Sequence, residues 1–285
     1  MVGTRLARRR PRARIAAAIL AVAIAGSARP ADGPMYTLAV VPNRPALVLH
    51  KTWTPFVERL SRDAGVPLQL KLYERLATFL DDSAAGAPDF IYSAPNMFFE
   101  AYRAQGYVPL VRGSRPLSGI VFVRKDSPYR KVEDLRGKTV AFVAPKSLCA
   151  VITRHAVETS GMRIDYTATF VGSTVNVAKM VVLRKADAGV MLDASLVSDN
   201  PDLAKELRII LQTRPLAPHV LAAHPRVPAK ARERVAEAVL RMGTAEDARA
   251  LLATVKIAEP VRAEYQRDYA LFEAIDPQPA GPPPP

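Results

Sequence analysis

A single cysteine and the histidine six residues after it are the residues of this chain that first suggest covalent chemistry. Cys149 lies in the segment PKSLCAVITRH, which ends at His155. If a helix begins at Leu148, six residues turn it by about 600°, so the two side chains lie on different faces. A catalytic Cys149 would therefore need a base from elsewhere in the fold, although the first turn of a helix favours a thiolate. We expect instead a small residue packed at the wall of a cleft.

The residues around Cys149 also fit a binding site that needs no reactive side chain. Pro145, Lys146 and Ser147 follow the predicted strand TVAFVA and lead into the helix, whose first backbone N–H groups then lack partners within the helix. Such an N-terminus binds anions through these groups and the helix dipole. Ser147 has two compatible roles, as N-cap and as a ligand donor. The sequence predicts ligand contacts from Ser147 and from the amides of Leu148 and Cys149.

Further candidate ligand contacts lie where predicted strands end. Tyr73 ends LQLKLY, and Tyr92 with Ser93 ends DFIYS. Thr174 and Asp193 stand at two later strand-to-helix junctions, before TVNVAKM and after DAGVML. In α/β folds, ligands bind outside the carboxyl ends of the strands. The alternative roles are ordinary strand-end aromatics for the tyrosines and helix capping for Thr174 and Asp193.

No catalytic or metal-binding motif accompanies these candidates. The four histidines are scattered, and His219 and His224 are five apart across a predicted strand, so they face opposite sides. No cluster of His, Cys, Asp or Glu has metal-ligand spacing, and the sequence contains no glycine-rich phosphate loop, GxSxG or HExxH. We therefore predict no metal, no cofactor and no enzymatic activity.

The N-terminus predicts export. Six arginines in MVGTRLARRRPRAR precede IAAAILAVAIAGSA, an apolar run that is too short to span a bilayer, which takes about 20 residues. Gly26-Ser27-Ala28 fits a cleavage site. We predict a signal peptide over 1–28 and a periplasmic protein; an uncleaved membrane anchor is the alternative.

The charge pattern indicates which kinds of partner this chain can bind, and the cysteine count bears on its stability. Removing the six arginines from a chain of net charge +13 leaves 34 basic and 27 acidic residues, a net charge of +7. The two signs are interspersed, as in VERLSRD, which indicates a solvated surface and no nucleic-acid partner. A mild positive field favours small anionic ligands.

One cysteine allows no internal disulfide, so a hydrophobic core must stabilise the fold. The end, 276–285, is a proline-rich tail that we expect to be disordered.

Short strand-like segments alternate with amphipathic helices along the remaining chain. In TWTPFVERLSRDAG, for example, Trp53, Phe56, Val57 and Leu60 have the spacing of one helix face. This alternation predicts an α/β fold with mostly parallel sheets flanked by helices. The strands are too many for one modest sheet, so we predict two lobes with a ligand cleft between them. Lobe 1 takes 29–118 plus 215–275 and lobe 2 takes 119–214.

In this order, these segments resemble the periplasmic phosphate/phosphite/phosphonate-binding proteins of ABC importers, a branch of the type II solute-binding proteins. The resemblance covers nearly the whole mature chain and is most specific in GIVFVRKDSPYRKVEDLRGKTVAF; the other matching segments are YTLAVVPNRP, WTPFVERLSRDAGVPLQL, DFIYSAPNMFFEAYRAQGYVPL and FVGSTVNVAKMVVLRKADAGVM. It implies a monomer that closes two lobes around a small anionic solute by a hinge motion and then meets a membrane permease. It also implies that Tyr73, Tyr92 and Ser93 line the first lobe and that Ser147, Leu148, Cys149, Thr174 and Asp193 line the second.

The sequence departs from the family at the anion loop. Where the family has a Ser-Thr-Ser-Gly-like run, this chain has Ser147-Leu148-Cys149-Ala150, and Thr174 stands where the family tends to have a histidine. Each lost hydrogen bond to a charged group is worth about 1.5–3 kcal/mol, so a phosphonate would bind more weakly. Two other functions stay open: a sensing module for a membrane histidine kinase or receptor, and, least favoured, a Cys149-dependent enzyme.

Overall fold

The computed structural model describes residues 1–3, 34–160, 165–199 and 201–275. Apart from residues 1–3, the predicted signal peptide over 1–28 lies outside the described residues, as does the predicted tail over 276–285. Both therefore stay predictions.

The first lobe is built on a six-stranded sheet with the strand order β11-β4-β10-β3-β1-β2. Strands β1 to β4 point the same way, while β10 and β11 run against them. The strands come from the two ends of the described chain: β1 (Tyr36–Val40), β2 (Leu68–Lys71), β3 (Phe90–Ser93), β4 (Val108–Gly113), β10 (Val220–Ala223) and β11 (Pro260–Arg262).

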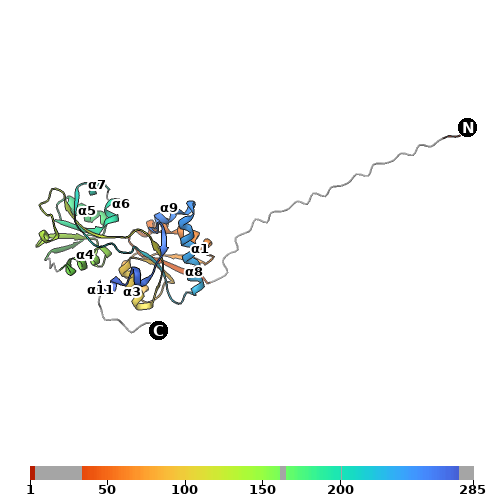
Figure 1. The fold of residues 1–285 in the computed structure, drawn as a ribbon, viewed down its shortest axis with the longest axis horizontal. Coiled ribbons are helices and arrows are strands. Elements are labelled where there is room, and N and C mark those ends of the chain that lie inside the picture. Colours follow the sequence, from red (N-terminus) through yellow and green to blue (C-terminus); the bar gives the residue numbers. More distant parts are fainter. Residues whose placement is uncertain (4–33, 161–164, 200, 276–285) are drawn as a thin grey trace.

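The second lobe is built on a five-stranded sheet with the order β7-β6-β8-β5-β9. Here β5 runs against the other four strands. All five come from one continuous stretch: β5 (Gly119–Arg124), β6 (Thr139–Phe142), β7 (Thr167–Phe170), β8 (Ala188–Leu192) and β9 (Leu207–Gln212). The predicted two-lobed α/β fold is confirmed, with mixed sheets in which most strands of each sheet are co-directional (Figure 1).

Two segments join the lobes, one between β4 and β5 and one between β9 and β10. They pair through Leu117 and Leu216, whose backbones exchange hydrogen bonds of 2.9 and 2.8 Å. Next to this bridge, the hydroxyl of Thr213 accepts a hydrogen bond of 2.9 Å from the amide of Gly119. The junction is thus held by local hydrogen bonds, and the lobe limits given above stay a prediction.

Helices cover both faces of the first sheet. One face packs against α1 (Ala46–Ala64), α8 (Ala229–Thr244) and α9 (Glu246–Thr254), and the other packs against α2 (Leu76–Ala84), α3 (Pro95–Gln105), α10 (Tyr265–Asp268) and α11 (Leu271–Ile275). The residues predicted for one face of this helix are buried, as expected: Trp53, Phe56, Val57 and Leu60. Gly65 follows α1 with a φ of 57°, a conformation in which glycine ends helices without strain.

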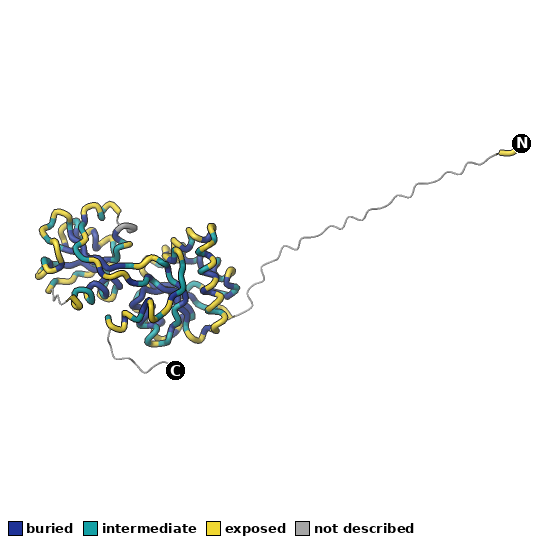
Figure 2. Tube along the Cα trace, in the orientation of Figure 1, coloured by how far each residue is buried: buried dark blue, intermediate teal, exposed yellow. Residues whose placement is uncertain are grey.

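The faces of the second sheet are covered less evenly. One face packs against α5 (Thr174–Val182), α6 (Asp193–Asp199) and α7 (Pro201–Ala204). Among the described residues, the opposite face packs mainly against α4 (Leu148–Thr159) and the 3-10 helix η1 (Val132–Leu135). Figure 2 shows the buried chain concentrated along both sheets and their connection. Helix α4 begins at Leu148, as the sequence predicts, and ends at Thr159.

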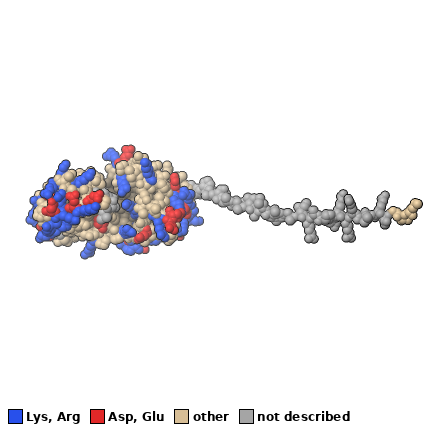
Figure 3. All heavy atoms as spheres, turned by 90° about the horizontal axis from the view of Figure 1, so that it is seen from above, with Lys and Arg blue, Asp and Glu red and all other residues tan. Residues whose placement is uncertain are grey.

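Two surface observations bear on the partners. Basic and acidic side chains are interspersed over the face seen in Figure 3, in keeping with the charge pattern of the sequence. Within the described parts of the chain, no helix is both long and apolar enough to cross a membrane.

Candidate ligand-binding site

The start of α4 has the backbone geometry of an anion site. Ser147 occupies the N-cap position in an extended conformation, but its hydroxyl donates to the carbonyl of Ala144 at 2.8 Å. The side chain of Ser147 does not accept a hydrogen bond from the first turn of α4, so its predicted side-chain N-cap role is wrong. The first amides of α4 therefore receive no cap from Ser147, and a helix start of this kind can bind an anionic ligand.

Leu148, the first residue of α4, packs into the other lobe. Its side chain is 5% exposed and belongs to an apolar cluster formed largely by the first lobe, which includes Tyr73, Phe79 and Met97. Ile152, one turn along α4, joins the same cluster. The residue that replaces a hydroxyl side chain of the family loop is thus an apolar contact between the lobes.

Asn96 makes a polar contact across the same junction. Its side-chain nitrogen, at the start of α3, donates to the carbonyl of Lys146 at 3.1 Å. Its Oδ1 atom is buried and has no hydrogen-bond partner among the described residues. The hydroxyl of Ser93, a fully buried residue, likewise has no partner in the described part of the chain. Because side chains alternate along a strand, Ser93 faces the same side of the sheet as Ile91, the side on which Leu148 packs.

These two unpartnered groups are the polar feature that most needs explanation here. A buried hydroxyl or amide oxygen without a partner costs about 1–3 kcal/mol. In native structures most such groups are satisfied by protein, water or ligand. Ser93 and Asn96 of the first lobe and the uncapped start of α4 in the second lobe therefore form a candidate site between the lobes, which we call the interlobe site.

Cys149 points away from this site. Its side chain is 4% exposed and packs with Val121, Val140 and Val190 over the second sheet. Its Sγ lies 3.9 Å from the carbonyl oxygen of Val190 and 3.4 Å from the hydroxyl of Ser147. Burial raises the pKa of the thiol, although the Ser147 hydroxyl and nearby backbone amides act against it. The expectation that the helix start would favour a thiolate is therefore wrong, and the thiol is a packed side chain.

The two predicted tyrosines lie in the first lobe, with their hydroxyls bound to protein. The Tyr73 hydroxyl donates to Oδ2 of Asp82 at 2.9 Å, and Lys71 binds the same oxygen at 2.7 Å. The Tyr92 hydroxyl donates to the carbonyl of Lys256 at 3.4 Å, on the opposite side of the sheet from Ser93. Burial raises the pKa of Tyr92 above its ordinary value. Neither hydroxyl is aimed at the interlobe site.

Asp193 and Thr174 mark helix starts in the second lobe. Oδ1 of Asp193 accepts hydrogen bonds from the amides of Ala194 at 2.7 Å and Ser118 at 3.1 Å. Asp193 therefore ties α6 to the segment that joins the lobes. At α5 the cap is Ser173, which accepts from the amide of Asn176 at 3.2 Å. Thr174 follows it, half-buried, so the alternative of capping is wrong for Thr174.

Sequence reasoning missed Asn96. Asn96 had a weak signal, since it follows a proline at a predicted helix start just after the strand DFIYS. The ring of His219 stacks on Tyr92 at 5.6 Å between centroids, and burial lowers the pKa of His219 to about 4. His219 is therefore neutral at physiological pH. No group of three potential metal ligands occurs among the residues that the structure describes.

Solved structures share this fold over most of the chain. XAC2383 from Xanthomonas citri, bound to chloride ion, superposes with a TM-score of 0.72 at 18% identity, covering 85% of this chain and 96% of that chain. PhnD1 from Prochlorococcus marinus, in complex with methylphosphonate, gives 0.72 at 14% identity with the same coverage. A binding protein component of an ABC phosphonate transporter from Pseudomonas aeruginosa gives 0.70 at 14% identity, covering 85% of this chain and 87% of that one. At these identities the likeness shows the fold alone.

The family follows from the sequence itself. A comparison with curated proteins finds no match. The profile of the family described as "ABC transporter, phosphonate, periplasmic substrate-binding protein" matches residues 38–269, well over half of the chain. The chain therefore belongs to the phosphonate-binding family of periplasmic substrate-binding proteins of ABC transporters.

Proposed function

We propose that this protein delivers a small organic anion, an alkylphosphonate or a close analogue, to an ABC importer. The observation that carries the proposal is the pair of buried polar atoms in Ser93 and Asn96 without partners among the described residues, with Asn96 bound to the carbonyl of Lys146 just before α4. Backbone amides bind the anionic oxygens, and the first lobe adds one hydroxyl and one amide oxygen. The structures bound to methylphosphonate and to chloride ion show that relatives of this fold take anions.

The residue at the start of α4 favours an organic over an inorganic anion. Leu148 brings an apolar side chain where the family loop carries a hydroxyl, and Tyr73 and Met97 continue the apolar surface. An alkyl group gains from contact with such a surface, whereas a phosphate or phosphite ion loses hydration there. In the proposal, Ser147 shapes the turn before α4 and Asp193 ties α6 to the segment that joins the lobes, whereas Tyr92 packs on the other face of the first sheet.

Transport follows from closure of the lobes. The ligand bridges α4 of the second lobe and α3 of the first, so it stabilises the closed form relative to the open form. The closed monomer then docks on a membrane permease. Export through residues 1–28 places it in the periplasm. No observation favours the alternative of a sensing module.

Calorimetric titration tests the ligand class. Residues 29–285 are titrated with methyl- to butylphosphonate, aminoethylphosphonate, phosphate, phosphite, alkylsulfonates and small carboxylates. We expect the alkylphosphonates to bind and phosphate to bind more weakly. Binding of another class alone would mean that the fold has been kept for a different solute.

Two alanine variants and a matched control locate the site. Ser93→Ala and Asn96→Ala each remove one buried polar group from the interlobe site, and we expect each to weaken binding roughly 10-fold or more, as for a hydrogen bond in a charged complex. Ser83 in α2 is the control, since its buried hydroxyl also lacks a partner among the described residues. Ser83→Ala should leave the affinity unchanged. Unchanged affinity in both test variants would remove the interlobe site from the proposal.

A further inference from the structure

The second lobe carries a basic surface at the end of its sheet that lies away from the interlobe site. Helix α4 follows the carboxyl end of β6, so the opposite end of the sheet holds the starts of β6, β8 and β9 and the end of β5. The turns at that end contact one another. The amide of Lys125 donates to the carbonyl of Glu206, and the amide of Asp187 donates to the carbonyl of Thr139, both at 2.9 Å. We call residues 124–138, 184–187 and 205–208 the distal edge.

Basic residues outnumber acidic residues at the distal edge. The three ranges hold ten basic and five acidic residues, a net charge of +5. Flanking charged residues lower this only to +4; they are Arg154, Glu158, Asp165, Lys179 and Asp202. In Figure 3, the end of the molecule formed by the second lobe shows many basic side chains with fewer acidic ones among them. The distal edge therefore accounts for more than half of the net charge of +7 predicted for the mature chain.

Three of the five carboxylates are bound by groups of the distal edge itself. Asp126 accepts hydrogen bonds from Arg124 at 2.8 Å and from Arg184 at 2.9 Å. Asp134 and Asp187 accept from backbone amides and from a tyrosine hydroxyl at 2.7 to 3.2 Å. These hydrogen bonds hold the carboxylates against the protein.

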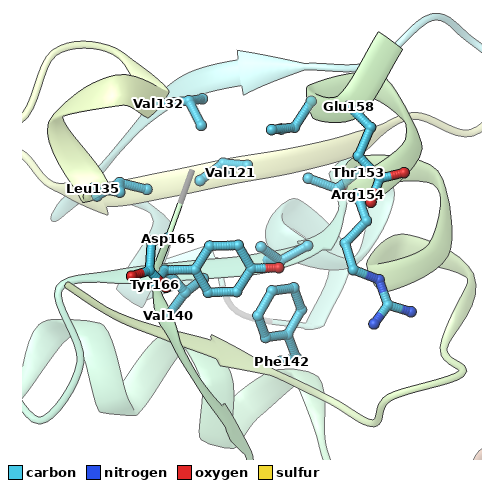
Figure 4. A pocket seen from close by; sticks show the side chains of 12 residues that line it. Val121, Val132, Leu135, Val140, Phe142, Thr153, Arg154, Glu158, Asp165 and Tyr166 are labelled. Atoms are coloured by element: carbon cyan, nitrogen blue, oxygen red, sulfur yellow. The ribbon is translucent and has the colours of Figure 1, made fainter. Parts of the chain in front are cut away.

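Several cations of the distal edge are exposed and unpaired. Figure 4 shows the side chains of Val132 and Leu135, the apolar residues of η1, turned towards the second sheet, where they are 6% and 2% exposed. Arg136, which follows η1, is exposed, and so are Lys125 and Lys185. None of these three cations forms an ion pair with another residue that the structure describes. Their charges are therefore available to an anionic partner.

A bilayer that contains anionic phospholipids fits this surface. Clusters of about four to eight basic residues bind such bilayers, and each residue near the surface strengthens binding roughly fivefold. A nucleic acid fits less well, because it also needs exposed aromatic rings for stacking. Tyr129 is the aromatic residue of these ranges; its hydroxyl binds Asp187, and the ammonium group of Lys138 lies 5.7 Å from the centre of its ring.

We propose that the distal edge docks on bilayers of anionic phospholipids. The docking surface is independent of the proposed transport ligand. The interlobe site lies at the opposite end of the second sheet and points away from the bilayer.

Co-sedimentation with lipid vesicles tests the proposal. Residues 29–285 are used, because the arginines of 1–28 would bind anionic lipid by themselves. At about 0.1 M salt, we expect binding to vesicles of phosphatidylcholine mixed with phosphatidylglycerol and little binding to phosphatidylcholine alone. Binding should be lost at about 1 M salt, where the screening length falls from about 10 Å to about 3 Å. No binding to the anionic vesicles, or equal binding to both kinds of vesicle, would overturn the proposal.

Two triple variants of equal net charge separate the distal edge from the general charge of the protein. The edge variant, Lys125→Gln with Arg136→Gln and Lys185→Gln, should bind anionic vesicles at least 10-fold more weakly. The matched control removes three exposed cations of the first lobe through Lys51→Gln, Lys230→Gln and Arg249→Gln. Its binding should stay within about twofold of the unmodified protein. Circular dichroism confirms that both variants are folded. Equal weakening in the two variants would mean that net charge alone acts, and the proposal would fail.

Energy transfer to a labelled lipid tests which end of the molecule meets the bilayer. The same fluorophore is attached at Pro128→Cys, an exposed position of the distal edge, or at Thr78→Cys, an exposed position on α2. The native Cys149 is buried and should not react in the folded protein. We expect stronger transfer from position 128 than from position 78. Equal transfer, or stronger transfer from position 78, would show that another face meets the bilayer and would overturn the proposal.

Discussion

Replacing Leu148 with alanine should open the lobes without unfolding either one. Leu148 belongs to α4 of the second lobe, yet it is buried in an apolar cluster built mainly by the first lobe. The substitution deletes three carbon atoms from this contact. At about 0.8 kcal/mol for each buried carbon, the closed form loses about 2.4 kcal/mol relative to the open form. The ratio of closed to open molecules should therefore fall roughly 50-fold.

Distance measurements between the lobes provide the assay. Spin labels at Thr78→Cys and Lys179→Cys, exposed positions on α2 and α5, report the interlobe distance by electron–electron double resonance. The native Cys149 is buried and should not take up label in the folded protein. We expect the Leu148→Ala protein to show a longer and broader distance distribution. Saturation with a ligand of the interlobe site should shift it back towards the closed distance.

A second leucine separates opening from ordinary loss of stability. Leu60 in α1 is fully buried inside the first lobe alone. Leu60→Ala should lower the unfolding free energy by about 2–5 kcal/mol and leave the interlobe distance unchanged. If Leu148→Ala behaved like Leu60→Ala, with lower stability and an unchanged distance, the reasoning about the interlobe contact would be refuted.

Three further predictions concern the thiol, a buried ion pair and a tight strand contact. Because burial raises its pKa, Cys149 should react with iodoacetamide at neutral pH far more slowly in the folded than in the urea-unfolded protein, as followed by mass spectrometry; complete labelling of folded protein within minutes would contradict this. Asp268→Asn should cost about 3–5 kcal/mol at pH 7 in urea unfolding, because it breaks the 3.0 Å ion pair between the buried Asp268 carboxylate and the half-buried Arg112. Burial alone would raise the pKa of Asp268, but its hydrogen bonds from arginines hold that pKa well below its usual range. The stabilisation is therefore present above about pH 4 and is lost as the pH falls through the lowered pKa of Asp268. The difference in unfolding free energy between the unmodified and the Asp268→Asn protein should shrink in acid. A difference that does not change with pH would argue against the ion pair. Gly189→Ala should cost about 1–3 kcal/mol, because its Cβ would lie 2.5 Å from Cζ of Phe122, and Phe122→Leu should recover part of that loss in urea-midpoint measurements.

The interlobe site was only partly visible in the sequence. Ser93 and the start of α4 were predicted from their places at a strand end and a helix N-terminus, which are local patterns. Nothing in those patterns shows whether a hydroxyl finds a partner. The Tyr92 hydroxyl binds the carbonyl of Lys256, which is 164 residues away in the chain, and the Asp193 carboxylate binds the amide of Ser118, which is 75 residues away.

The sequence by itself determined the alternation of strands and helices, the buried face of α1 and the first residue of α4, because hydrophobic periodicity and turn residues act over a few neighbours. The order of the segments along the sequence also identified the family. Only the tertiary structure decided that Leu148 enters the opposite lobe, that Cys149 turns to the second sheet and that Ser93 and Asn96 remain without partners among the described residues. These outcomes depend on which distant segments the two sheets bring together, and strand pairing across more than 100 residues leaves no periodic trace in the chain.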